Sequence, residues 1–162
     1  MGSTRCHDPQ EEECVVPQLG SGASKTAYGS GYYTINDYKA ILRYANDRHI
    51  RVIPEISLPI HTHAAKRAME VRYRKYMNYG NKSAAHQFLL TDFEDKTEYL
   101  TMQMFKDNAI NICMNSTYEF IRHVVRSIKD MHVDIQPLRT LHIGGNAIQL
   151  EYFLAIAQKK ST

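Results

Sequence analysis

Apolar residues recur at helical spacing in three stretches of the chain and gather into two short apolar runs between them. The first helix is predicted to begin at Thr34 and Asp37, which form a capping-box pattern, and to end near His49. A second helix is predicted from about residue 64 to residue 79. The apolar face of the first helix is expected to be buried through five residues: Ile35, Tyr38, Ile41, Leu42 and Ala45.

The third helix is predicted to open at Ser116 and Glu119, a second capping box. The two apolar runs are predicted as buried strands, near 51–56 ("RVIPEI") and near 139–144 (within "LRTLHIGG"). Strands that alternate with helices favour a parallel sheet, which places chemistry at the carboxyl ends of its strands. The segments "PEISLPIHTH" and "HIGGNAIQ" follow these ends.

The remaining segments have no comparable period. Residues 1–33 are rich in Gly, Ser and Pro and are predicted to form a loop-rich arm. The stretch between the second helix and Cys113 is polar and irregular, and residues 149–162 are expected to form a C-terminal helix or tail. The βα core is therefore predicted to span residues 34–148.

The composition excludes several classes. The 162 residues suffice for one domain, and no apolar run approaches the roughly 20 residues that a membrane span needs. With a net charge of +3, the basic cluster at 72–75 is interpreted as a solvated helix face, so no nucleic-acid partner is expected. His61 and His63 form an H-x-H pair, but no Cys or carboxylate follows at ligand spacing. No metal or cofactor is expected.

The cysteines and sequons bear on the compartment. Cys6 and Cys14 bracket a polar loop, and they form either a small disulfide loop or two free thiols. Cys113 is predicted to be a buried thiol or the remnant of a pair. Asn81 and Asn115 open N-glycosylation sequons, which are used only in a secretory lumen. The first ten residues contain no apolar stretch typical of a signal peptide.

Two motifs resemble one family. "VIPEISLPIHTHA" (52–64) is similar to the third barrel strand of the β-N-acetylhexosaminidases of glycoside hydrolase family 20, chitobiase-like branch, and "HIGGNA" (142–147) is similar to the end of the fourth. The resemblance covers about residues 5–148, and "RCHDPQEEECVVPQLGSG" looks like the family's disulfide loop after strand two. It implies an α/β fold, a partial (β/α)8 TIM-barrel segment that covers about the third and fourth barrel strands.

The family's mechanism gives meaning to the turn after the fourth strand. The resemblance implies a substrate-assisted retaining hydrolysis. In this mechanism an Asp orients the 2-acetamido group of the sugar, and the next residue, a Glu, is the general acid. These two positions are Asn146 and Ala147 here. Asparagine carries no charge to balance the oxazolinium, and alanine has no proton to give. By this resemblance no catalytic residue is intact.

Other positions divide into survivors and departures. Glu55, His61, His142, Gly144 and Gly145 match the family and are interpreted as substrate-site remnants. Ser57 replaces an Asp and Ile60 replaces a small residue, and the chain has no Trp for the family's aromatic cage. Without the resemblance, three alternatives stay open: Glu55 as a strand-end surface carboxylate, His142 as a structural strand histidine rather than a catalyst, and Gly144 with Gly145 as a plain turn.

The resulting functional prediction is a degenerate β-N-acetylhexosaminidase-like protein of N-acetylglucosamine or chitooligosaccharide metabolism, without hydrolytic turnover. Two alternatives stay open: a weakly active hydrolase that borrows a carboxylate, and a truncated product with only an interaction function. The expected partners are N-acetylhexosamine-containing glycans and further copies of the chain that associate through open sheet edges. The resemblance implies the secretory pathway, with a lysosomal or extracellular location.

Overall fold

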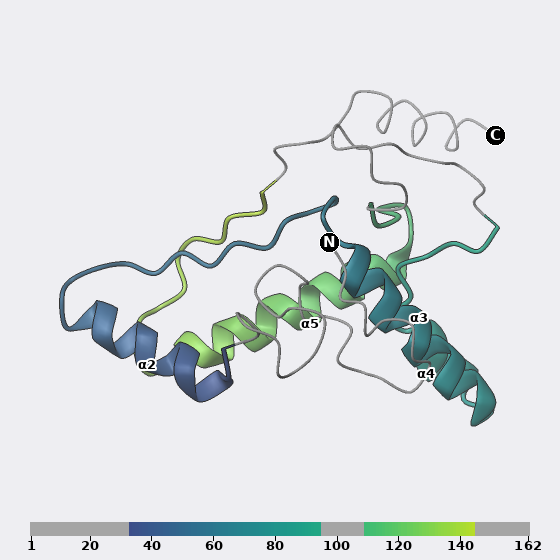
Figure 1. The fold of residues 1–162 in the computed structure, drawn as a ribbon, viewed down its shortest axis with the longest axis horizontal. Coiled ribbons are helices and arrows are strands. Elements are labelled where there is room, and N and C mark those ends of the chain that lie inside the picture. The colour runs from purple at the N-terminus through teal and green to yellow at the C-terminus, as the bar shows by residue number, and fades with distance from the viewer. Residues whose placement is uncertain (1–32, 95–108, 145–162) are drawn as a thin grey trace, which may run out of the picture.

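The structure, a computed structural model, describes residues 33–94 and 109–144. Its helices are α2 (Ile35–Asn46), α3 (His63–Asn78), α4 (Lys82–His86) and α5 (Asn115–His132). Figure 1 shows α5 running from the α3–α4 pair to α2, with two extended segments passing side by side along it. One of these segments connects α2 to α3, and the other follows α5.

Helix α2 begins as predicted. The Thr34 hydroxyl accepts the Asp37 N–H at 3.1 Å, and the Asp37 carboxylate accepts the Thr34 N–H at 2.9 Å, which completes the capping box. Leu42 and Ala45 are buried, and α2 packs against α5. The expected burial of Ile35 and Ile41 is wrong, since both are exposed. Helical periodicity shows which residues share a face, but not how much of that face another element covers.

Helices α3 and α4 pack against each other and lie together in Figure 1. The bounds of α3 agree with the predicted helix to within one residue at each end. Helix α4 was not predicted, because its five residues are too few to show a period. Asn81 caps it by accepting the Ala84 N–H at 3.0 Å.

The third helix is confirmed, but its predicted capping box is wrong. Helix α5 begins one residue earlier, with Met114 as the N-cap and no side-chain capping bond. The Ser116 hydroxyl instead donates to the Leu89 carbonyl at 2.6 Å, and Glu119 pairs with Arg122. A carbonyl from a distant loop thus takes the hydroxyl that local spacing assigned to the helix end.

The two predicted strands are not present as strands in the described residues. The segments meet in one isolated parallel bridge, Glu55 to His142. Around it the His142 N–H donates to the Pro54 carbonyl at 3.0 Å, and the Ile56 N–H donates to the His142 carbonyl at 2.9 Å. Pro54 has no N–H, so the ladder cannot continue through it. The expected burial of these segments is also wrong at Ile53, which is 50% exposed, and at Ile143, which is 59% exposed.

The core of the described residues is small and lies in two places. One part is the α2–α5 contact, where Leu42 and His132 are fully buried. The other lies around α3, α4 and the loops at 89–90 and 109–110, with Leu90 and Ile110 at about 1% exposure each. Within the described ranges, no helix combines the length and apolarity that crossing a membrane requires.

Candidate functional site

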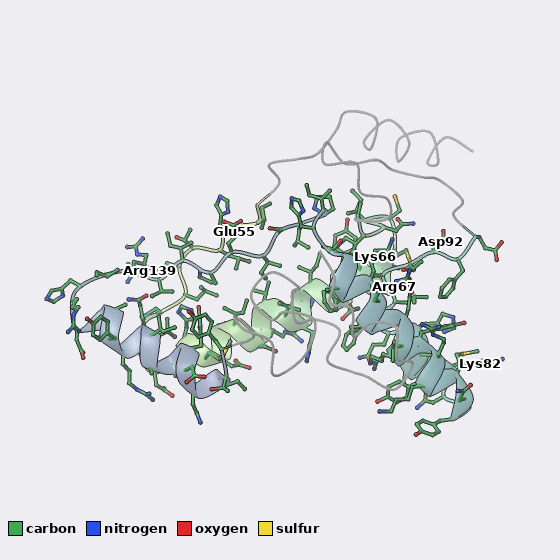
Figure 2. The ribbon with its side chains drawn as sticks, viewed as in Figure 1. Glu55, Lys66, Arg67, Lys82, Asp92 and Arg139 are labelled. Carbon is green, nitrogen blue, oxygen red and sulfur yellow. The ribbon has the colours of Figure 1, made fainter. Side chains whose placement is uncertain are left out.

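The parallel bridge brings two of the predicted site residues into contact. Glu55 lies in the segment that connects α2 to α3, His142 lies in the segment that follows α5, and the His142 Nδ1 lies 2.8 Å from the Glu55 Oε2. Both side chains are more than half exposed, at 61% for His142 and 55% for Glu55. Figure 2 shows Glu55 on the side of its segment that points away from α5. The pair is therefore open to solvent and to a ligand.

The contact with Glu55 determines which nitrogen of the His142 imidazole carries a hydrogen. An ionised carboxylate only accepts hydrogen bonds, so the His142 Nδ1 is the donor. The Gly144 N–H lies 3.3 Å from the same nitrogen and cannot donate to it at the same time. In neutral His142 the Nε2 is then left as an acceptor, and in charged His142 it is a donor. Because both groups are exposed, the pair contributes less than about 1 kcal/mol to stability.

Gly144, two residues after His142, has a backbone conformation that favours glycine. Gly144 has a φ of 66°, and a Cβ at this position would lie 3.0 Å from the Ser57 Cα. A side chain at 144 would therefore be strained and would press on the neighbouring segment. The Ser57 Oγ would lie 3.2 Å from the same Cβ, so the two segments approach closely at this point. Gly145, Asn146 and Ala147 lie outside the described residues.

His61 stands at the entrance to α3. It is half-buried and has a φ of 59°, a backbone conformation that residues other than glycine seldom adopt. The loop around it is held through the Pro59 carbonyl, which accepts the Thr62 hydroxyl at 3.1 Å and the Ile110 N–H at 2.9 Å. Among residues 33–94 and 109–144, no three His, Cys, Asp or Glu side chains gather as a metal site.

The other predicted positions are placed as follows. Asn81 is exposed at the start of α4, and Asn115 is exposed as the first residue of α5. Cys113 is a free, exposed thiol, so the expectation that it is buried is wrong. Its backbone N–H donates to the Asn111 side-chain oxygen at 2.9 Å. Cys6 and Cys14 lie outside the described residues.

One group that supports the site has no sequence signal. The Gln136 side chain accepts the Val52 N–H at 2.7 Å and donates to the Ile50 carbonyl at 2.8 Å. The backbone carbonyl of Gln136 contacts the buried His132 ring, whose other nitrogen lies 2.9 Å from the Tyr38 hydroxyl. A glutamine between a helix end and a proline matches no motif, and only the contacts reveal its role.

The chain is similar to known proteins over almost all of its length. The family model described as glycosyl hydrolase family 20, catalytic domain, matches residues 1–160. A β-hexosaminidase of Vibrio vulnificus is 46% identical over 147 residues, and an N,N'-diacetylchitobiase of Vibrio harveyi is 42% identical over 148 residues. Each alignment covers 90% of this chain and 17% of the relative.

A solved structure agrees with these matches. An inactive mutant of an exo-β-N-acetylglucosaminidase from Vibrio harveyi superposes with a TM-score of 0.56 at 27% identity, over 82% of this chain and 18% of the other. This chain thus spans less than a fifth of the length of these relatives. Because the family match extends over both segments that meet at Glu55 and His142, the chain belongs to glycosyl hydrolase family 20.

Proposed function

We propose that the chain is a catalytically degenerate part of a β-N-acetylhexosaminidase domain that no longer hydrolyses its substrate. The observation that carries the proposal is the sequence Asn146-Ala147, which follows "HIGG" where the family pattern has Asp-Glu. The family's catalytic domain is a TIM barrel. We assign the segments near 51–56 and 139–144 to its third and fourth strands, with 1–33 as a loop-rich arm and 149–162 as a C-terminal helix or tail.

The chemistry lost at the turn is the proton and the charge that hydrolysis needs. Ala147 offers no general acid to the departing glycosidic oxygen, which alone costs about 10²- to 10⁴-fold in rate. Asn146 can accept a hydrogen bond from an acetamide N–H, but it cannot balance the positive oxazolinium. The two losses act on the same transition state. Turnover is then expected to fall below detection.

What persists is a polar face suited to a sugar. The His142 Nδ1 donates to Glu55, so with respect to residues 33–94 and 109–144 the second carboxylate oxygen and the His142 Nε2 stay available for hydroxyl groups. Both residues are exposed, as a ligand site requires. The relatives are named for β-hexosaminidase and chitobiase activity, so we propose N-acetylglucosamine and its short oligomers as the ligand class. The chain has no tryptophan for an aromatic cage, which favours weak binding.

The test measures hydrolysis and binding on one sample. The purified chain is incubated with an aryl N-acetyl-β-glucosaminide, beside a buffer control and a catalytically active family 20 enzyme. No release of chromophore above buffer is expected, together with weak calorimetric binding of chitooligosaccharides that is lost in Glu55→Ala. Turnover by the unmodified chain would falsify the degenerate-site proposal and favour a weakly active hydrolase. Absence of both signals favours a truncated product with only an interaction function.

Restoring the two lost groups gives a second, independent readout. We expect Asn146→Asp combined with Ala147→Glu to remain inactive, because positioning of the sugar supplies several kcal/mol of barrier reduction and this chain lacks the tryptophans that would provide it. The single variant Ala147→Glu is the matched control. Rescue by the double variant would show instead that these 162 residues hold the substrate well enough for catalysis.

We further propose a secretory location with a Cys6–Cys14 disulfide and glycans on the two sequons. Asn81 is exposed, and its Oδ1 takes the Ala84 N–H while the amide nitrogen is left for a glycan. The Thr117 hydroxyl is fully buried, so Asn115 would have to be modified before folding. Non-reducing mass analysis and a glycosidase mobility shift on material from the native source test these assignments. An unmodified, fully reduced chain would overturn them.

We also propose that the chain associates with further copies of itself. Ile53 and Ile143 flank the parallel bridge and are both exposed. Two adjoining extended segments with apolar side chains in water offer a surface for a further strand. Size-exclusion chromatography with light scattering is expected to give a mass above that of one chain, and Ile143→Lys is expected to lower it. A concentration-independent monomer would contradict this association.

A further inference from the structure

The register of the two extended segments decides whether Glu55 and His142 can meet. Successive side chains of an extended segment point to opposite faces, so a slip of one residue would turn Glu55 away from His142. The backbone bonds around the bridge are few: His142 is bonded to Pro54 and Ile56, and the Leu58 N–H donates to the Ile143 carbonyl at 2.9 Å. This last bond leaves the parallel register, because the in-register acceptor would be Gly144.

The ladder is also interrupted on the other side of the bridge. Two residues before His142, the Thr140 carbonyl would accept the N–H of residue 54 in a regular parallel ladder. Residue 54 is a proline and has no N–H. The register is therefore supported weakly by the ladder itself, and a further restraint is needed to hold it.

The Gln136 carboxamide supplies bonds with the geometry of a ladder position. His142 brackets Glu55 by bonding to the carbonyl before it and to the N–H after it. Gln136 brackets Arg51 in the same way, through the Ile50 carbonyl at 2.8 Å and the Val52 N–H at 2.7 Å. Arg51 lies four residues before Glu55, and the residue four before His142 is Leu138. The side-chain amide of Gln136 thus stands where the peptide of Leu138 would stand in a regular ladder.

Gln136 is itself held firmly by the end of α5. Its N–H donates to the His132 carbonyl at 3.1 Å, and its own carbonyl accepts from the His132 Nδ1 at 2.8 Å. The His132 ring is 1% exposed and lies 2.9 Å from the Tyr38 hydroxyl of α2 through Nε2. Because a carbonyl only accepts, Nδ1 carries the hydrogen, and the Nε2 of neutral His132 accepts from Tyr38. Gln136 is therefore anchored in the α2–α5 core.

We propose that Gln136 is a positioning residue, whose carboxamide replaces a strand peptide opposite Arg51 and sets the register in which Glu55 meets His142. The restraint acts from about 13 Å along the segment, at about 3.3 Å per residue. It serves the residual ligand face and does not depend on whether that face hydrolyses a sugar.

Disulfide trapping reads the register directly. Paired strands lie about 4.8 Å apart, which suits a disulfide between opposing residues. The in-register pair is Glu55→Cys with His142→Cys, and the slipped pair is Glu55→Cys with Ile143→Cys. Each pair is oxidised mildly in three backgrounds: the parent chain, Gln136→Met and Gln87→Met. Peptide mapping by mass spectrometry separates these cross-links from any that involve native cysteines. Gln87→Met is the matched control, because Gln87 contacts only Arg72 among the bonds described for its side chain.

The expected result is a high ratio of in-register to slipped cross-link in the parent and in Gln87→Met, and a ratio about ten-fold lower in Gln136→Met. A ten-fold change corresponds to about 1.4 kcal/mol, the order expected when two hydrogen bonds are lost. Because the cysteine pairs remove the Glu55–His142 contact, any register that persists comes from the backbone and Gln136. An unchanged ratio in Gln136→Met, with helical circular dichroism intact, would overturn the proposal.

A second variant covers loss of folding. If Gln136→Met loses its helical signal, Gln136→Glu is used, since it keeps the size and the acceptor for the Val52 N–H but loses the donor to the Ile50 carbonyl. Its ratio is expected to fall below that of the parent, and a ratio equal to the parent's would likewise overturn the proposal. Neither result bears on hydrolysis, so failure here and failure of the degenerate-site proposal are distinguishable.

Discussion

Thr117 joins the start of α5 to the loop before it and offers a measurable test of the core. Its side chain is fully buried, and its hydroxyl donates to the Asn111 carbonyl at 2.6 Å. The Asn111 N–H in turn donates to the Leu90 carbonyl at 3.3 Å, so this loop links α5 to the second part of the core. Thr117→Val keeps the shape of the side chain and removes only the hydrogen bond.

The magnitude follows from burial. A typical intramolecular hydrogen bond contributes about 0.5–1.5 kcal/mol, and a buried partner left without one raises the cost to about 1–3 kcal/mol. We expect Thr117→Val to lower the free energy of unfolding by about 2 kcal/mol, and the melting temperature by roughly 4–8 °C for a chain of this size. Thr117→Ser keeps the hydroxyl and loses one methyl group, so it is expected to cost only about 1 kcal/mol.

The assay is equilibrium unfolding in urea, followed by helical circular dichroism, of the parent and both variants. Expression in a host without N-glycosylation keeps the Asn115 sequon from affecting the comparison. A shared slope for the three curves shows that the difference lies in stability. If Thr117→Val is as stable as the parent, or more stable than Thr117→Ser, the hydroxyl is not the stabilising group and the reasoning is wrong.

Three further predictions concern single contacts. Hydrogen bonds from the Thr34 hydroxyl and then the Thr34 N–H lower the pKa of Asp37 below 3.8, so the α2 capping box is intact above pH 3.8 and is lost as the pH falls through the lowered value. Amide exchange at the start of α2 should show this fraying, and Asp37→Ala should abolish its pH dependence. Burial raises the pKa of Tyr38 above 10.0, so its contribution is intact below pH 10.0 and is lost as the pH rises through the raised value. The melting temperature should fall with rising pH across that range in the parent, and this fall should be smaller in Tyr38→Phe. The Arg72 guanidinium lies over the Tyr76 and Phe88 rings and donates to the Ala84 carbonyl, so Arg72→Met should weaken amide protection in α4. Arg72→Lys should not restore this protection, because an ammonium group lacks the planar shape that stacks on a ring and donates in a fork.

The helices show what local sequence decides. The Thr34–Asp37 capping box and the apolar period placed α2, and similar reasoning placed α3 and α5 to within a few residues. These signals act between residues three or four apart, so the rest of the chain is not needed to read them. The burial of α2 was predicted less well, since Ile35 is 64% exposed. An apolar period shows which residues share a helix face, but it does not show which part of that face another element covers.

The candidate site could be predicted from the sequence only in part. The motifs "VIPEISLPIHTHA" and "HIGGNA" carried the family and marked Glu55 and His142 as residues of interest. The 2.8 Å contact between them joins residues that are 87 positions apart in the sequence (142 − 55), and it depends on one bridge and its register. No short-range pattern encodes a register.

Tertiary structure alone decided the partners of those polar groups that bond to residues far away in the sequence. Ser116 belongs to a capping-box pattern, in which its hydroxyl would accept the Glu119 N–H. The hydroxyl donates instead to the Leu89 carbonyl, which folding brings near it. Gln136 has no motif at all, yet its carboxamide takes a ladder position beside Arg51. Sequence determined where α2, α3 and α5 form and which family the chain belongs to. Folding determined which distant groups satisfy one another, because a hydrogen bond between remote residues forms only after the chain has brought them together.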